Sequence, residues 1–229
     1  MFLPPPSHEK VLKQVTLARN RYLAPPYLQD LHEFMEALAG QMIPKRAPDF
    51  SDIDIIADDE IEHAIMLARS RTQRRHGMWA MVDTVWTNDL ADLIGGRTCL
   101  EVMAGAGWLA KALSAHGANV IATDLDVRAK WGKRATVHPI KPLDALTAIA
   151  RHPEAEILLV SWPPYADTVI ELLAEAWGSE QPIIYIGENH GGCTATEMFC
   201  MQLRIIEGLK IPCWPSLHDE VMIGHYLFS

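Results

Sequence analysis

The stretch LEVMAGAGWLAKAL, residues 100 to 113, sets the architecture of the chain. An apolar run leads into two glycines, Gly105 and Gly107, and an amphipathic stretch follows at once. Strand, glycine turn and helix in this order predict a ligand-binding loop, because glycine allows close backbone approach and the helix start offers free N–H groups. With Ala110 the glycines also satisfy the G-x-G-x-x-A dinucleotide pattern, and Asp124 lies near the spacing of its ribose-binding acid.

From residue 97 onward, short apolar runs alternate with amphipathic stretches, which predicts a parallel sheet wrapped by helices. The tail predicts two final strands that pair antiparallel. We expect strands at 98–103, 119–124, 136–140, 156–162 and 182–187, helices at 108–117, 167–177 and 194–207, and the closing strand pair at 209–214 and 221–228.

Residues 7 to 94, the helical leader, carry almost no strand signal. Ser7 can cap a first helix, Pro25 and Pro26 separate it from a second, and Asp59 begins a third. A fourth helix is expected from about residue 88 to the glycines at 95 and 96. We therefore predict a helical extension or cap over residues 1–95 and a second domain over residues 96–229.

Composition narrows the classes of function. The 229 residues carry a formal net charge of −9, which disfavours broad binding to duplex nucleic acid, although residues 69–76 and 128–141 form two basic stretches. The four cysteines show no zinc-ligand spacing, so we expect no metal. No apolar run is long enough for a membrane span and the start lacks a secretory pattern, so we expect a cytoplasmic protein without a membrane partner.

Three features decide between cofactors. Glu101 is an acid inside the first strand, where an unpaired carboxylate would be costly unless a ligand served it. A Pro-Pro-Tyr sequence follows the fourth strand, and a strand pair closes the sheet. Over residues 97–229 the chain thus resembles the class I S-adenosylmethionine-dependent methyltransferases. The resemblance implies an α/β fold with a Rossmann-like seven-stranded sheet, mostly parallel with an antiparallel C-terminal strand, and leaves a dinucleotide dehydrogenase as a minor alternative.

The resemblance also implies which residues bind S-adenosylmethionine. The family's acid and glycine loop corresponds to residues 101–107, although Met103 replaces its first glycine. The ribose acid corresponds to Asp124, with Asp126 as the fallback, and the adenine acid to Asp144; each acid could instead cap a helix. The expected cofactor-binding residues are Glu101, Met103, Ala104, Gly105, Gly107, Asp124, Leu125, Asp144, Ala145 and Ser161.

The loop VSWPPYAD, residues 160–167, departs from the Asn/Asp-Pro-Pro-Tyr sequence of relatives that methylate amino groups. Trp162 replaces the Asn or Asp and so removes one acceptor of the amine, since an indole offers only a donor. Pro163 keeps its carbonyl and Tyr165 its stacking face. Trp162 could present its ring to a cation or an aromatic substrate, or could pack beneath the leader. Methylation of nucleobase amino groups is therefore disfavoured.

A second polar loop, residues 185–199, follows the fifth strand and should face the same crevice. His190 is a candidate general base, which Glu188 could orient; the alternative is a solvated turn that caps nearby helices. The candidate catalytic residues are Trp162, Pro163, Tyr165, Glu188 and His190.

The sequence as a whole favours an S-adenosylmethionine-dependent methyltransferase that acts on a small molecule or an unidentified acceptor, with the leader closing over the site. Two alternatives remain open: a lyase that cleaves the same cofactor, and a cofactor-binding module without catalysis. A nucleic-acid partner stays disfavoured, and the sequence does not indicate an oligomeric state.

Overall fold

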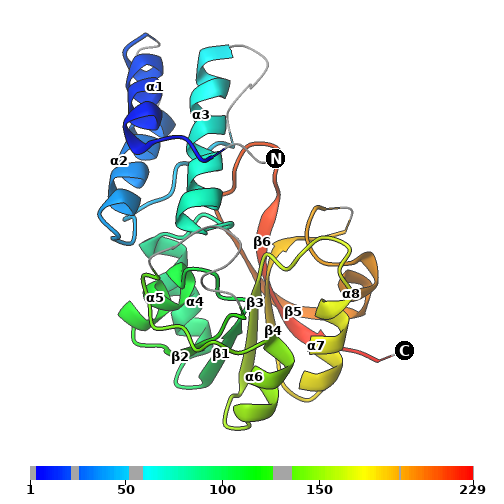
Figure 1. Ribbon diagram of the computed structural model, residues 1–229. Coiled ribbons are helices and arrows are strands. Elements are labelled where there is room, and N and C mark those ends of the chain that lie inside the picture. The colour runs from blue at the N-terminus through cyan, green and yellow to red at the C-terminus, as the bar shows by residue number, and fades with distance from the viewer. Residues whose placement is uncertain (1–3, 22–25, 52–58, 126–135, 191, 229) are drawn as a thin grey trace.

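The computed structural model describes residues 4–21, 26–51, 59–125, 136–190 and 192–228 (Figure 1). In the described part of the helical leader there are four α-helices and a short π-helix. Its elements are α1 (His8–Arg21), α2 (Pro26–Ala39), α3 (Asp59–Arg71), the π-helix η2 (Thr72–His76) and α4 (Thr84–Ile94). The first three stand together at one end of the molecule, whereas α4 lies against the sheet. None of the described helices is long and apolar enough to cross a membrane.

The second part of the chain alternates strands and helices and ends in two antiparallel strands. Its elements are β1 (Thr98–Val102), α5 (Trp108–Ala115), β2 (Asn119–Ala122), α6 (Ala145–Arg151), β3 (Ile157–Ser161), α7 (Val169–Trp177), β4 (Ile183–Glu188), α8 (Glu197–Gln202), β5 (Leu203–Lys210) and β6 (Asp219–Tyr226). The strand order is β2-β1-β3-β4-β6-β5, and β6 runs antiparallel to both of its neighbours. The other pairs are parallel, so the predicted Rossmann-like α/β fold with an antiparallel closing strand is confirmed.

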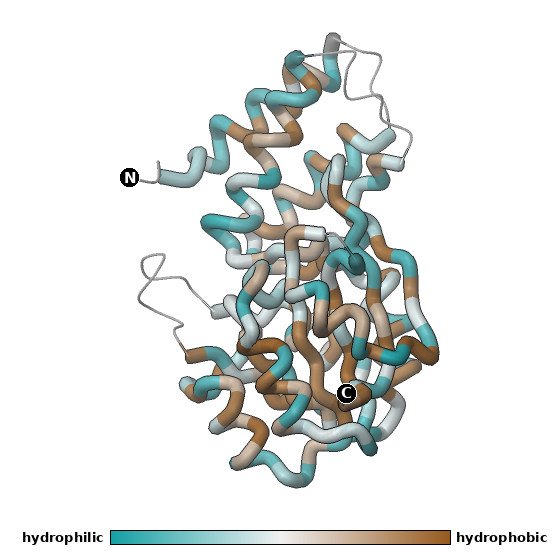
Figure 2. The backbone as a smooth tube through the Cα atoms, turned by 90° about the vertical axis from the view of Figure 1, so that its right-hand side faces the viewer, coloured by the Kyte–Doolittle hydropathy of each residue, from teal (hydrophilic) through white to brown (hydrophobic). Residues whose placement is uncertain are grey.

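Alternation along the strands divides the apolar core between the two faces of the sheet. One face of β3 and β4 contributes residues such as Leu159 and Ile184, which pack with α4 and α5. The other face contributes residues such as Leu158 and Tyr185, which pack with α6, α7 and α8. Figure 2 shows the apolar strands in brown inside the lower half of the molecule. Both faces are therefore covered, as a largely parallel sheet requires.

The leader shares its core with one face of the sheet. Trp214, in the connection from β5 to β6, is fully buried and meets Phe34 of α2 edge-on at 6.3 Å between ring centroids. Its indole also stacks on Phe50 at 5.9 Å. The buried side chains of α1, α2 and α3 form one continuous cluster with those of β3 and β4. The division into domains at residue 95 stays a prediction.

Several predicted elements differ from the structure. The described residues form six strands rather than seven, because the stretch 136–140 forms no strand; Lys141 and Thr123 make an isolated parallel bridge instead. The helix predicted over 194–207 is shorter than expected, since α8 spans Glu197–Gln202 and β5 begins at Leu203. The final strands therefore start earlier than expected. Helix α4 begins at Thr84 rather than near residue 88, because the Asp83 carboxylate accepts the Val85 and Trp86 N–H groups.

Candidate active site

The glycine loop joins β1 to α5 through three residues with left-handed backbone. Met103 has φ 56°, Gly105 φ 58° and Gly107 φ 83°. Met103 thus adopts the conformation that glycine would favour, which agrees with its place at a family glycine. The neighbouring Ala104 donates its N–H to the Thr123 carbonyl at 3.0 Å, and this bond ties the loop to the end of β2.

Contacts within the protein explain why residues 105 and 107 of this loop are glycines. A Cβ on Gly105 would lie 3.2 Å from the Gly77 carbonyl, and one on Gly107 would lie 2.8 Å from the Ile140 side chain. The Trp108 indole donates to the His76 carbonyl at 2.8 Å, so the end of η2 lies directly on the loop. The glycines by themselves therefore do not indicate a ligand, and the case for one depends on the acids beside them.

Glu101 lies at the start of the loop and is 2 % exposed. Its Oε2 has no hydrogen-bond partner among the described residues. Burial, and in addition the charge of Asp124, raise the pKa of Glu101 to about 8, although the backbone N–H of Ala110, at the beginning of α5, lowers it. A buried carboxyl oxygen without a donor is costly, so this position favours a ligand that brings a donor or a positive charge.

Asp124 follows β2 and faces the same loop. Its Oδ2 accepts the Gly105 N–H at 2.8 Å, which places the carboxylate beside the glycine turn; its contact with a ribose stays a prediction. Leu125 comes next and its side chain is exposed. Asp126, the fallback, lies outside the described residues.

The remaining predicted cofactor residues lie along the same edge of the sheet. Asp144 caps α6, because its Oδ1 accepts the Thr147 N–H at 2.9 Å; the capping alternative for this residue is thus observed, and its adenine contact stays a prediction. Ala145 is the first residue of α6, and Ser161 is the last residue of β3.

The Trp-Pro-Pro-Tyr loop turns sharply at Trp162, which has φ 52°. The Trp162 N–H bonds to the Ile186 carbonyl at 2.8 Å, and its indole Nε1 donates to Asp219 Oδ1 at 2.9 Å. Its ring stacks on Trp79 of the leader, with centroids 5.5 Å apart and planes at 24°. Trp162 therefore packs beneath the leader, as one alternative expected, and also bonds to Asp219; a role of its ring toward a cation or an aromatic substrate stays a prediction.

Two neighbours in that loop differ from expectation. The Pro163 carbonyl, predicted to be open to an acceptor, receives the Ala195 N–H at 3.5 Å, a long hydrogen bond. Tyr165 is 69 % exposed, so its ring contributes no wall to the buried part of the site. Their catalytic roles stay predictions.

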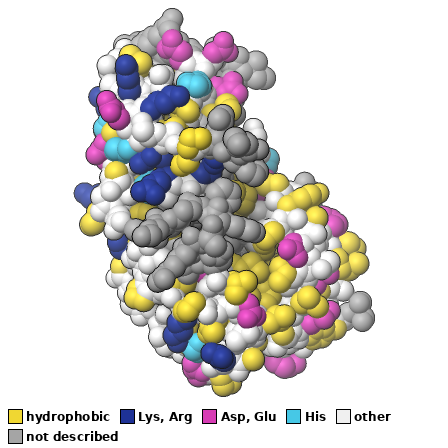
Figure 3. All heavy atoms as spheres, viewed as in Figure 1, with side chains coloured by type: hydrophobic (Ala, Val, Ile, Leu, Met, Phe, Trp, Pro, Cys, Tyr) yellow, Lys and Arg dark blue, Asp and Glu magenta, His cyan; other side chains and the backbone are white. Residues whose placement is uncertain are grey.

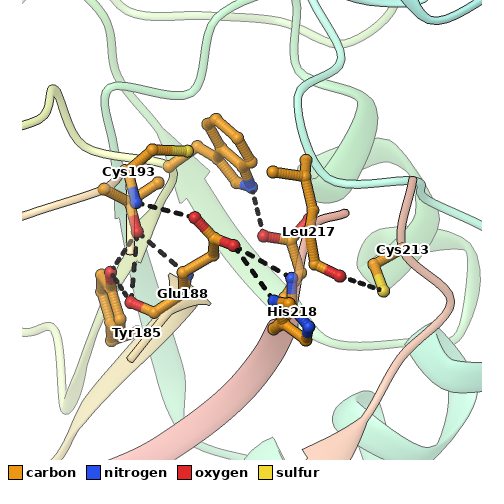
Figure 4. Close-up of polar contacts among 9 residues, drawn as sticks. Tyr185, Glu188, Cys193, Cys213, Leu217 and His218 are labelled. Carbon is orange, nitrogen blue, oxygen red and sulfur yellow. Dashed lines mark hydrogen bonds and ion pairs between the residues drawn. The ribbon is translucent and has the colours of Figure 1, made fainter. Parts of the chain in front are cut away.

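Glu188 ends β4 and is buried at the centre of the second polar loop (Figure 4). Its Oε2 accepts the Cys193 N–H at 2.7 Å, and its Oε1 accepts the His218 N–H at 3.0 Å. Burial alone would raise the pKa of Glu188, but these hydrogen bonds outweigh it and leave the pKa below its ordinary value. The contact expected between Glu188 and His190 is not the one observed. His190 instead pairs with Glu197 at 2.8 Å on the surface.

Sequence reasoning missed two residues of this site, Asp219 and Trp79. Asp219 begins β6 and is the direct cross-strand partner of Glu188. Burial raises the pKa of Asp219 to about 7, with a further contribution from Glu188. Two ionised carboxylates on directly paired residues would repel one another, so the pair favours a proton or a cation. No local pattern indicates either residue, because the register of β6 and the docking of the leader bring them there.

The residues of the candidate site thus form two groups on one face of the sheet. Glu101 and Asp124 flank the glycine loop, while Trp162, Glu188 and Asp219 lie across β3 from it with Trp79 above. We call the second group, made of Trp79, Trp162, Glu188 and Asp219, the aromatic–acid cluster.

Comparison with known proteins gives likeness in structure alone. No family model matches the chain, and no curated protein matches it in sequence. Similar solved structures include a mutant of MtNAS, at 12 % identity over 96 % of this chain and 97 % of that one, with a TM-score of 0.44. Others are 1,6-didemethyltoxoflavin-N1-methyltransferase from Burkholderia thailandensis, at 16 % over 75 % and 92 % with a TM-score of 0.44, and TehB from Haemophilus influenzae, at 9 % over 69 % and 67 % with a TM-score of 0.41.

At these identities the assignment rests on the sheet itself. The parallel strands, the glycine loop after β1 and the reversed β6 between β4 and β5 agree with the architecture that the residue pattern implied. The chain has a Rossmann-like α/β fold with one antiparallel strand near the edge of the sheet, as the resemblance to the class I S-adenosylmethionine-dependent methyltransferases implied.

Proposed function

We propose that the chain is an S-adenosylmethionine-dependent methyltransferase that acts on a small-molecule acceptor. One observation carries the choice of cofactor: the buried Glu101 carboxyl group, whose Oε2 has no hydrogen-bond partner among the described residues, lies beside the start of α5. In dinucleotide-binding folds that helix start receives a pyrophosphate. Here a buried carboxyl group lies at that place, and the Asp124 carboxylate lies beside it. Two acids leave no room for a pyrophosphate, and a bound cation would favour the ionised form of Glu101.

The residues fit the chemistry of the proposed cofactor. S-adenosylmethionine supplies an electrophilic methyl group on a positively charged sulfonium, together with an ammonium and a ribose that donate hydrogen bonds. Glu101 offers an unpartnered buried oxygen to such a donor, and Asp124 lies where ribose hydroxyls would be accepted. The chain's own part is then to align the acceptor and exclude water, and Trp162 lies between the loop and the acids of β4 and β6.

Calorimetric titration tests the choice of cofactor. The protein should bind S-adenosylmethionine and not NAD, and Asp124→Ala should weaken that binding by about 1 to 3 kcal/mol because a charged acceptor is lost. Asp89→Ala, which removes an exposed aspartate of α4, is the matched control and should bind as the unaltered protein does. Preference for NAD, or an Asp124 variant with unchanged affinity, would contradict the proposal.

Labelled cofactor then separates the possible activities. Transfer of the methyl group only when an acceptor is added supports the methyltransferase. Cleavage without an acceptor would instead identify a lyase, and binding without turnover would identify a cofactor-binding module.

A nucleic-acid acceptor has one observation in its favour. Lys and Arg side chains gather on the helical part of the face in Figure 3, and the last turns of α3 and η2 contain Arg69, Arg71, Arg74 and Arg75. Activity that falls steeply with added salt would indicate that acceptor.

A further inference from the structure

The pair formed by Asp219 and Glu188 has an unfilled hydrogen-bonding capacity. Asp219 is 3 % exposed, and no described residue donates a hydrogen bond to its Oδ2. Its other oxygen is fixed by the Trp162 indole, so the carboxyl group cannot turn to satisfy Oδ2 without losing that bond. Native structures rarely leave a buried carboxyl oxygen without a donor, which points to a ligand group that donates.

The position and surroundings of Oδ2 narrow the kind of donor. Glu188 and Asp219 stand opposite one another in the β4–β6 ladder, so their side chains leave the same face of the sheet. Two acids in one buried place favour a group that carries positive charge as well as hydrogen atoms. The stacked indoles of Trp79 and Trp162 add aromatic surface, which attracts both organic cations and planar rings. An ammonium group attached to an apolar or aromatic body meets all of these conditions.

We infer that the aromatic–acid cluster is the acceptor site of the proposed methyltransferase and that it takes an organic amine, which Asp219 deprotonates. The inference rests on the proposed function. The amine would bind as its ammonium form and give one proton to the ionised Asp219 Oδ2, which leaves a neutral amine with a free lone pair. With the cofactor bound, that lone pair would form the N–C bond to the methyl carbon, while the C–S bond would break and its electrons would stay on sulfur. The methylated ammonium leaves and Asp219 returns its proton to solvent.

The charges around Asp219 are compatible with this role. The groups that interact with it electrostatically are Glu188 on β4, Arg69 on α3, Tyr185 on β4, and Cys193 and Cys213 in the adjoining loops, with His218 beside it in the chain. Burial raises the pKa of Asp219 to about 7, so near neutral pH the carboxyl group both accepts and releases a proton readily.

The aromatic–acid cluster explains how an amine could be bound although Trp162 replaces the Asn or Asp found in enzymes that methylate amino groups. Trp162 offers no acceptor, but its Nε1 orients an acceptor that comes from β6 instead. The Asp219 Oδ2 atom is closed to solvent, so an amine must displace part of the wall to reach it. Trp79, with 39 % of its surface exposed, is the most exposed member of the cluster.

Binding measured without the cofactor tests the inference separately from the proposed function. Benzylamine and benzyl alcohol, and phenethylamine and 2-phenylethanol, are pairs that differ only in the amino group. In calorimetric titrations the unaltered protein should bind each amine at least 10-fold more tightly than its alcohol, a difference of about 1.4 kcal/mol. This comparison needs no variant, so a folding defect cannot obscure it.

Two variants then test whether Asp219 is the residue that causes the preference for the amine over the alcohol. Asp219→Asn retains an acceptor for the Trp162 indole but not the charge, and should reduce the amine preference to less than 2-fold. Glu220→Gln is the matched control, because it makes the same charge change at the next residue of β6, on the other face of the strand. It should keep the full preference.

Each outcome of these titrations either supports or overturns the inference. Equal affinity for amine and alcohol, no measurable binding of either, or an Asp219→Asn protein that still prefers the amine would overturn the inference. Failure to bind S-adenosylmethionine would overturn the proposed function instead, and the amine titrations would be unaffected by it.

Discussion

Glu101→Gln should make the protein more stable and weaken its binding of the cofactor. Burial raises the pKa of Glu101 to about 8, against 4.5 for an ordinary glutamate. The folded state therefore favours the neutral carboxyl group, and the stability that this group contributes is complete below pH 4.5 and is lost as the pH rises through 8. Glutamine has nearly the same shape and stays neutral throughout, so it avoids that loss.

The size of the effect follows from the linkage between protonation and folding. At pH 7, two and a half pH units above the ordinary value, keeping Glu101 protonated in the folded state costs about 3 kcal/mol, at 1.36 kcal/mol for each unit. The variant should exceed the unaltered protein in free energy of unfolding by that amount at pH 7, by less than 1 kcal/mol at pH 5, and by about 5 kcal/mol above pH 8. In a chain of this size the pH 7 difference corresponds to a rise in Tm of roughly 6 to 12 °C.

Urea unfolding of both proteins between pH 5 and pH 8.5 measures this difference. Glu180→Gln, at an exposed glutamate, provides the control and should show no growing gap. A gap between Glu101→Gln and the unaltered protein that stays constant with pH would refute the reasoning, because it would show that Glu101 is not held neutral by burial. The variant should also bind S-adenosylmethionine less tightly, since the proposed ligand needs the carboxylate.

Three further variants test the packing around the site. Trp162→Phe should lower the free energy of unfolding by about 1 to 3 kcal/mol in urea titrations, because Asp219 then loses its remaining donor; an unchanged midpoint would contradict that bond. Gly107→Ala should cost more than Gly178→Ala, because both have positive φ but only the first would place a Cβ 2.8 Å from a side chain, and equal thermal shifts would argue against this contact. Trp214→Ala should cost about 3 to 5 kcal/mol and lower the melting of the leader and the sheet together, followed by circular dichroism and fluorescence; separate transitions would show that the two parts do not share a core.

Local patterns predicted most of the sheet correctly. The apolar runs that became β1, β3 and β4 are flanked by turn residues, and alternation along them is unnecessary because both faces are buried. The acid of the first strand and the acid after the second reached the positions expected for them. These predictions succeeded because strand, turn and helix in a β-α unit follow each other directly in sequence.

Contacts that depend on strand register or on the docking of the leader could not be predicted. Asp219 faces Glu188 only because of the register between β6 and β4, and no spacing within the chain encodes that register. The exposed residues Ile205 and Ile206 lie in a strand at the edge of the sheet, where a bulge interrupts the pairing and removes the usual alternation. The requirement for Gly105 comes from Gly77, which is distant in sequence.

The apolar core around Trp214, which the leader shares with the sheet, matters for attempts to change the acceptor that we propose for the site. Trp79 stacks on Trp162 and belongs to the same leader whose helices complete the interior of the molecule. Transplanting this segment onto a related scaffold would carry with it an apolar stripe made to fit Trp214 and its neighbours. New specificity is better sought by single replacements at the half-exposed indole than by exchanging the whole segment.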